Sequence, residues 1–77
     1  MIKGYVLIKL VPGLESRTLA QIRSTPGVLD VDLVFGHWDA LAVAEAKTIF
    51  ELTKVVVGQV RGIQGVQDTE TLLQGEI

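Results

Sequence analysis

Residues 22–30 read IRSTPGVLD, and residues 60–68 read VRGIQGVQD. In each copy, a segment with helical spacing of apolar residues carries an Arg and leads into a Gly-Val step, followed by an extended stretch with an Asp. A short chain that repeats helix, Gly-Val step and strand is expected to consist of two β-α-β halves folded against each other. The repeat constrains the architecture strongly, but it says little about chemistry.

Hydrophobic periodicity around the two copies predicts the remaining elements. Strands are expected at residues 2–11, 28–35, 39–46 and 66–73, and helices at residues 14–24 and 48–61. Thr48 is the expected N-cap of the second helix, and Glu51 completes a capping box. This signal outweighs the strand propensity of residues 55–57, and it places Ile49 on the buried stripe of the helix. The tail after Gly75 is expected to be loose.

The order β-α-β-β-α-β with right-handed crossovers predicts an α+β fold, a ferredoxin-like sandwich or α/β-plait. A four-stranded antiparallel sheet would carry two helices on one face, in a single domain over residues 1–77. If the turn at residues 36–39 closes a hairpin, Phe35 lies opposite Ala40 and Leu33 opposite Ala42. Alternation then directs Leu29, Val31, Leu33 and Phe35 towards the helices.

The outer face of this predicted sheet mixes apolar side chains with charges of both signs. Its expected members are Lys3, Tyr5, Leu7, Lys9, Asp30, Asp32, Val34, Leu41, Val43 and Glu45. A face that only meets solvent would be more polar, so this composition favours a subunit interface and a dimer.

Composition narrows the class of protein. A core built from 77 residues is marginal, and the chain has no Cys and one His, which excludes disulfides and argues against a structural zinc site. Self-association is therefore the expected source of added stability. A net charge of −2 with scattered basic residues argues against direct nucleic-acid binding, and no apolar run approaches the roughly 20 residues of a membrane helix. The chain enters a strand pattern at once, so we expect no signal peptide and a cytoplasmic location.

Residues 33–43, LVFGHWDALAV, resemble the strand–turn–strand of the effector domain of Lrp/AsnC transcriptional regulators, often called the RAM domain. Residues 65–72, GVQDTETL, are similar to the family's closing Gly-Val, variable pair and Thr-containing strand. The resemblance covers roughly residues 2–74 and rests on the order and spacing of the motifs. Because the chain begins at the first strand of that domain, it resembles a stand-alone form without the helix-turn-helix domain.

The resemblance implies homodimers that form through the sheets and assemble into higher oligomers. It also implies an amino acid or similar small effector, bound between dimers, and a role in transcriptional or metabolic regulation without direct contact to DNA. Full-length Lrp/AsnC regulators are further implied partners. Carried over to this sequence, the ligand-binding residues are Gly36, His37, Trp38 and Asp39, with Gln67, Thr69 and Thr71 as weaker candidates. A turn Gly exposes N–H groups to a carboxylate, and Asp accepts from an ammonium.

Most of these residues also have a purely structural interpretation. Gly36 fits a turn that needs positive φ, and Asp39 fits an Asx bond that closes the same turn. Trp38 equally fits an oligomer contact, and Thr69 and Thr71 fit an ordinary edge strand.

Catalysis and metal binding have weaker support. His37 has no second titratable residue at a recognisable spacing, so we expect no catalytic residue. Asp30 and Asp32 share one face of a strand, but Lys3 and Lys9 are expected to offset them across the sheet. No metal and no cofactor are therefore expected.

Three functions remain open from the sequence. The first is a non-enzymatic oligomeric sensor of an amino-acid-like effector. The second is a small dimeric ferredoxin-like enzyme of the monooxygenase type, which would need a roomy pocket with polar groups inside. The third is a purely structural assembly module.

Overall fold

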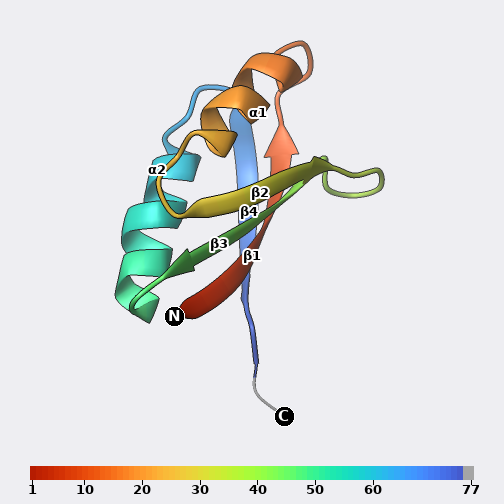
Figure 1. The fold of residues 1–77 in the computed structure, drawn as a ribbon. Helices are drawn as coiled ribbons and strands as arrows, with labels where there is room; N and C mark the ends of the chain where they lie inside the picture. The colour runs from red at the N-terminus through yellow and green to blue at the C-terminus, as the bar shows by residue number, and fades with distance from the viewer. Residues whose placement is uncertain (76–77) are drawn as a thin grey trace.

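The computed structural model describes residues 1–75 and has the element order that the sequence predicts (Figure 1). The strands are β1 (Ile2–Leu10), β2 (Val28–Leu33), β3 (Ala40–Ala46) and β4 (Val66–Leu73). The helical elements are α1 (Glu15–Arg23), the π-helical segment η1 (Glu51–Val56) and α2 (Val57–Arg61), which continues η1 directly. The predicted loose tail after Gly75 lies outside the described residues. Within them, no helix is long and apolar enough to cross a membrane.

The strands form one antiparallel sheet in the order β2-β3-β1-β4. Figure 1 shows α1 and the η1–α2 helix on the same face of this sheet. The α+β ferredoxin-like sandwich predicted from the repeat is therefore confirmed. Buried and partly exposed residues alternate along β1 and β3, as expected for strands with one face against helices.

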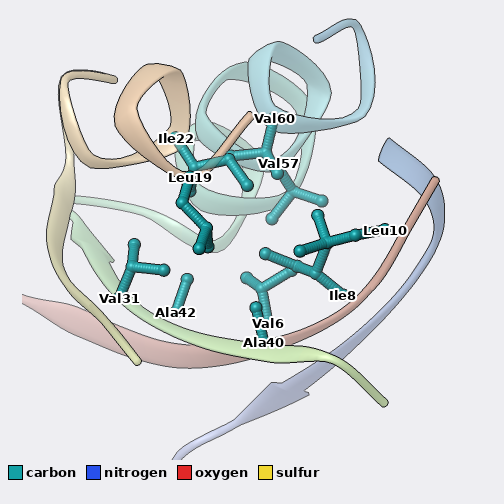
Figure 2. Packing of buried hydrophobic residues seen from close by; sticks show 10 residues of the cluster. All are labelled: Val6, Ile8, Leu10, Leu19, Ile22, Val31, Ala40, Ala42, Val57 and Val60. Carbon is teal, nitrogen blue, oxygen red and sulfur yellow. The ribbon is translucent and has the colours of Figure 1, made fainter. Parts of the chain in front are cut away.

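The core lies between the helices and the sheet (Figure 2). Leu19 and Ile22 reach the sheet from α1, and Val57 and Val60 reach it from α2. The main cluster also contains the strand residues Val6, Ile8, Leu10, Val31, Ala40 and Ala42. Burying one such aliphatic side chain stabilises a fold by about 1.5–3 kcal/mol, so these few residues supply much of the stability of a small domain.

The two Gly-Val steps of the repeat adopt the same conformation. Gly27 has φ 94° and Gly65 has φ 106°, in the region that favours glycine. The Gly27 carbonyl accepts a hydrogen bond from the N–H of Glu45 at 2.9 Å, and the Gly65 carbonyl accepts one from Val11 at 2.8 Å. Each step thus joins the end of a helix to the end of a strand in the other half of the repeat.

The register of the β2–β3 hairpin differs from the prediction. Leu33 lies opposite Ala40 and Val31 opposite Ala42, a shift of two residues along β2. The turn closes earlier than expected because the N–H of Val34 donates to the carbonyl of Asp39 at 3.0 Å. Phe35 consequently leaves the sheet and is fully exposed, so its predicted place against the helices is wrong.

Two further expectations for β2 are wrong. A register shift between Val28 and Asp30 leaves Leu29 bulged, and Leu29 and Leu33 are exposed rather than buried. The strand order also places β3 between β2 and β1. Lys3 is therefore opposite Glu45, and Lys9 is opposite Asp68, so neither lysine lies opposite an acidic residue of β2.

The second helix begins with one half of the predicted capping box, because Thr48 caps it as expected but Glu51 reaches back to Lys47 instead of Thr48. Thr48 Oγ1 accepts from the N–H of Glu51 at 3.0 Å, while the Glu51 carboxylate accepts from the N–H of Lys47 at 3.3 Å. After an α-helical start at residues 49–50, the helix is π-helical over Glu51–Val56. Leu52, Val56 and Val60 of the predicted stripe are buried, but Ile49, which lies in the first turn before η1, is exposed, so its predicted burial is wrong.

Candidate functional site

Asp39 ties the β2–β3 turn to β1. Its carbonyl accepts from the N–H of Val34, and its own N–H donates to the carbonyl of Ile8 at 2.9 Å. Its carboxylate oxygen Oδ2 accepts from the N–H of Leu10 at 2.9 Å. This bond crosses to the neighbouring strand rather than closing the turn, so the expected Asx interpretation does not describe it. Asp39 instead holds together the turn, the end of β2 and the end of β1.

The other turn residues form a tip that projects beyond the sheet, with Gly36 and His37 exposed and Trp38 half-buried (Figure 1). Gly36 has φ 134°, and the space where a Cβ would lie is open. The rings of His37 and Trp38 meet edge to face, with centroids 5.2 Å apart. Lys9 Nζ donates to the carbonyl of His37 at 3.1 Å, which adds a second link between the tip and β1.

A hollow of about 320 Å³ lies beside Asp39, where β1 ends and α1 begins. Its polar lining consists of Lys9, Glu15, Asp39 and Gln67. Its apolar lining consists of Leu10, Pro12, Leu33, Val34 and Phe35. The volume is at the lower end of the range of about 300–1,000 Å³ for small-molecule sites. We refer to this feature as the turn hollow.

The charged groups of the turn hollow are held in place but retain free capacity. Glu15 Oε1 accepts from the N–H of Gly13 at 2.9 Å, as Asp39 Oδ2 accepts from Leu10. A carboxylate offers about four acceptor sites and an ammonium three donors, so Lys9 and Glu15 can each take a further partner. The bond to Glu15 is exposed, whereas the bond to Asp39 is part-buried and belongs to the packing of β1 against the turn. One cation and two anions beside an apolar wall suit a small molecule that carries both charges.

The structure brings only two of the seven predicted site residues into the turn hollow, Asp39 and Gln67. The segment 36–38 lies in the adjoining tip and does not line it. Thr69 and Thr71 lie along β4 opposite Ile8 and Val6, on the side of the sheet that faces the helices.

Lys9 and Glu15 were missed by the sequence analysis. One signal was present, because the ferredoxin-like strand order places the end of β1 beside the start of β3 and therefore beside Asp39. Residues near the end of β1 and the start of α1 were for that reason candidates. In the part of the chain that the structure covers, no group of three or more His, Cys, Asp or Glu side chains could hold a metal ion.

The outer face of the sheet forms a second candidate surface. In the pairing register, Tyr5 lies between Val43 and Leu72, and Leu7 lies between Leu41 and Glu70. The apolar block of this face consists of Tyr5, Leu7, Leu41, Val43 and Leu72. Charged residues surround it, with Asp30 and Asp32 on β2 and Asp68 and Glu70 on β4. An apolar centre with a polar rim is the usual anatomy of a protein interface.

Comparison with curated proteins relates this chain to transcriptional regulators. An uncharacterized HTH-type transcriptional regulator of Pyrococcus horikoshii is 39% identical over 73 residues, which cover 91% of this chain and 49% of the relative. Similar matches occur in Pyrococcus furiosus and Pyrococcus abyssi. The chain spans about half the length of these relatives.

Solved structures share the fold over nearly the whole chain. A protein of Thermus thermophilus has a TM-score of 0.90 and 32% identity, covering 100% of this chain and 96% of its own. A transcriptional regulator of Neisseria meningitidis, solved as a complex with L-Met, has a TM-score of 0.84 and 19% identity, covering 97% of this chain and 50% of its own. The family model of the Lrp/AsnC ligand binding domain matches residues 3–74, and this chain therefore belongs to the Lrp/AsnC ligand binding domain family.

Proposed function

We propose that this domain binds an amino acid or a similar small effector as part of an oligomeric regulator, and that it neither catalyses a reaction nor contacts DNA. The turn hollow carries the proposal, because it places charges of both signs beside an apolar wall. The family assignment and the L-Met complex of the Neisseria regulator support an amino-acid-like effector. Regulation of transcription or metabolism by such a domain takes place in the cytoplasm.

The residues inferred from the family have different parts in this proposal. Asp39 and Gln67 line the turn hollow directly. The tip at residues 36–38 contacts the effector from the side on which another dimer approaches. Thr69 and Thr71 are peripheral, because they lie along β4 away from the hollow.

The apolar block on the outer face supports a homodimer formed through the sheet. Tyr5 and Leu7 lie at its centre, and both are only partly buried in the single chain. Dimers would then assemble further around the tip, and full-length Lrp/AsnC regulators would join mixed assemblies through the same face. Light scattering and sedimentation test this part. A well-folded monomer at micromolar concentration would contradict it.

The enzymatic alternative loses its main support in the structure. It required a buried cavity between sheet and helices with His37 directed inward. His37 instead lies exposed in the tip, and Ala40 and Ala42 belong to the packed core rather than to an open space.

Calorimetric titration with the twenty free amino acids tests the proposed function. We expect saturable heat at or below millimolar concentration for a subset of them. No heat from any member of the set would contradict effector binding.

The Asp39→Ala variant separates the sensor from a structural assembly module. Under the sensor proposal its affinity for the amino acid falls by about tenfold or more, a change equivalent to about 1.4 kcal/mol, while the oligomer survives. An assembly that changes in this variant, together with an absence of effector binding in the parent protein, would favour the structural module.

A further inference from the structure

We infer that Lys9 and Glu15 fix the two charged groups of the effector, with Lys9 taking its carboxylate and Glu15 its ammonium. Asp39 acts as a positioning residue, which holds the wall of the site rather than the ligand. This inference rests on the proposed function, because it requires the turn hollow to be the effector site. It assigns roles to residues that lie outside the motif shared with the family.

Both backbone groups and one carboxylate oxygen of Asp39 already have hydrogen-bond partners in the fold, and the carboxylate bond is part-buried, unlike that of Glu15. The backbone N–H and carbonyl of Asp39 join Ile8 and Val34, and its carboxylate accepts from the N–H of Leu10 at 2.9 Å. Leu10 is buried, so an effector ammonium that drew this carboxylate away would leave a buried N–H without a partner. Leaving such a group unpaired is unfavourable, and the Asp39 carboxylate is therefore better suited to hold β1 against the turn.

Lys9 supplies the cation that lines the turn hollow. Its ammonium donates to the carbonyl of His37 at 3.1 Å, and an ammonium has two further donors to offer a carboxylate. Asp68 lies opposite Lys9 across the sheet, but its Oδ1 accepts from the N–H of Thr69 at 2.9 Å. Because Lys9 also holds the tip, a carboxylate bound to it would contact the segment through which dimers are proposed to meet.

Glu15 supplies the second charge that a zwitterion needs. It begins α1, and its Oε1 accepts from the N–H of Gly13 at 2.9 Å, which leaves the other carboxylate oxygen for an ammonium. Leu33 and Phe35 also line the hollow, and both are largely exposed, with Phe35 at 103% of its reference surface. An apolar side chain of the effector would cover them, so the preferred effector is a free amino acid with an apolar side chain.

Calorimetry with L-methionine and its two single-charge analogues tests these roles. The analogues are 3-(methylthio)propylamine, which lacks the carboxylate, and 4-(methylthio)butanoic acid, which lacks the ammonium. For the parent protein we expect L-methionine to bind at least roughly tenfold more tightly than either analogue, as charge-assisted hydrogen bonds are strong.

The variants should lose this discrimination one group at a time. In Lys9→Met, L-methionine and the amine should bind equally, and in Glu15→Gln, L-methionine and the acid should bind equally. The Gln side chain retains the acceptor for the N–H of Gly13, so the local fold is kept. Lys54→Met, which alters an exposed lysine on η1, is the matched control and should bind as the parent does.

Asp39→Asn tests the positioning role, because an Asn oxygen still accepts from the N–H of Leu10. Affinity for L-methionine within about threefold of the parent supports that role, whereas loss of more than tenfold would show that the Asp39 charge binds the effector.

The remaining outcomes distinguish a failure of this inference from a failure of the proposed function. Discrimination that persists in Lys9→Met or Glu15→Gln would overturn the inference and leave the proposed function standing. Binding of polar amino acids alone, with no heat from L-methionine, would do the same. Failure of every free amino acid to bind would remove both.

Discussion

The two Gly-Val steps share one backbone conformation but pack against different chemistry. A Cβ on Gly27 would lie 2.7 Å from Cγ2 of Val56, whereas a Cβ on Gly65 would overlap the hydroxyl of Thr18. Thr18 is fully buried, and its hydroxyl donates to the carbonyl of Gln64 at 3.1 Å. The internal repeat therefore keeps the backbone turn, while the side chain that covers it is apolar in one half and hydrogen-bonded in the other.

The two halves of the repeat also differ in the hollow that follows the first strand of each half. The turn hollow follows β1, and an equivalent hollow of about 380 Å³ follows β3, beside Gly27 and Glu51. In the second hollow the Glu51 carboxylate accepts from the N–H of Lys47 as part of the helix cap. Of the two, the turn hollow is the one bordered by the exposed hairpin and Asp39. Equivalent positions have thus taken a structural role in one half and a proposed binding role in the other.

The largest effect is expected from Gly65→Ala. The added methyl meets the buried Thr18 side chain and occupies a backbone with φ 106°, so overpacking and conformational strain combine. We expect a loss of about 3 kcal/mol or more in the free energy of unfolding, measured by urea denaturation. Combining it with Thr18→Ala should recover part of the loss. Equal stability of the single and double variants would contradict the proposed contact.

Gly27→Ala should cost less, about 2 kcal/mol in the same measurement, because the methyl meets one branch of an aliphatic side chain rather than a hydrogen-bonded hydroxyl. Val56→Ala is the matched second change and should relieve the contact while adding its own cavity. A loss as large as that of Gly65→Ala would show that the backbone conformation, and not the covering side chain, dominates both turns.

Asp39→Ala should destabilise the domain by about 1–3 kcal/mol, because the buried N–H of Leu10 loses its acceptor. Asp39→Asn keeps an acceptor and should cost less than half as much. Urea denaturation of both variants checks the difference. Equal losses would mean that the negative charge, rather than the hydrogen bond, stabilises the turn.

Thr48→Ala removes the side-chain oxygen that accepts from the N–H of Glu51 and should cost about 1 kcal/mol. The first helix has no such side-chain cap at Leu14, so this loss is specific to the second half of the repeat. Helical circular dichroism during thermal unfolding provides the measurement. An unchanged melting temperature would contradict the capping box.

The smallest effect on stability is expected from Phe35→Ala. The side chain is fully exposed, so the free energy of unfolding should change by no more than about 0.5 kcal/mol. Binding of L-methionine should weaken, because the proposed apolar wall loses one member. A large loss of stability would show that Phe35 packs against the domain in solution.

Patterns among residues close in the chain were sufficient to predict most of the secondary structure. The Thr48 cap and the Gly-Val steps can each be recognised from residues close in the chain, and the structure confirms them, although the Glu51 half of the predicted capping box bonds to Lys47 instead. The predicted register of the β2–β3 hairpin was wrong because the register depends on where the turn closes. That closure is set by the hydrogen bonds of Asp39 to Val34 and to β1. The predicted burial of Ile49 was wrong because this residue lies in the first turn of the helix, whereas Leu52, Val56 and Val60 of the same stripe are buried as expected.

The candidate site likewise contains one residue that a local motif predicted and others that only the tertiary structure brings to it. The hairpin motif pointed to Asp39, which lies at the turn hollow, but the other lining charges come from β1 and α1. Lys9 and Glu15 are distant from Asp39 in the chain, and only strand pairing brings them to one place. No local pattern marked them, because a lysine near a strand end and a glutamate at a helix start are common features of solvated surfaces.

The order of amino acids alone determined the repeat, the α+β class and the outward direction of the mixed face, because helical and strand periodicities are properties of neighbouring residues. Tertiary structure decided which strand lies between β2 and β1, where the hairpin closes and which charges surround the turn hollow. Those features depend on hydrogen bonds such as that from the N–H of Leu10 to Asp39, which exist only after distant segments have packed.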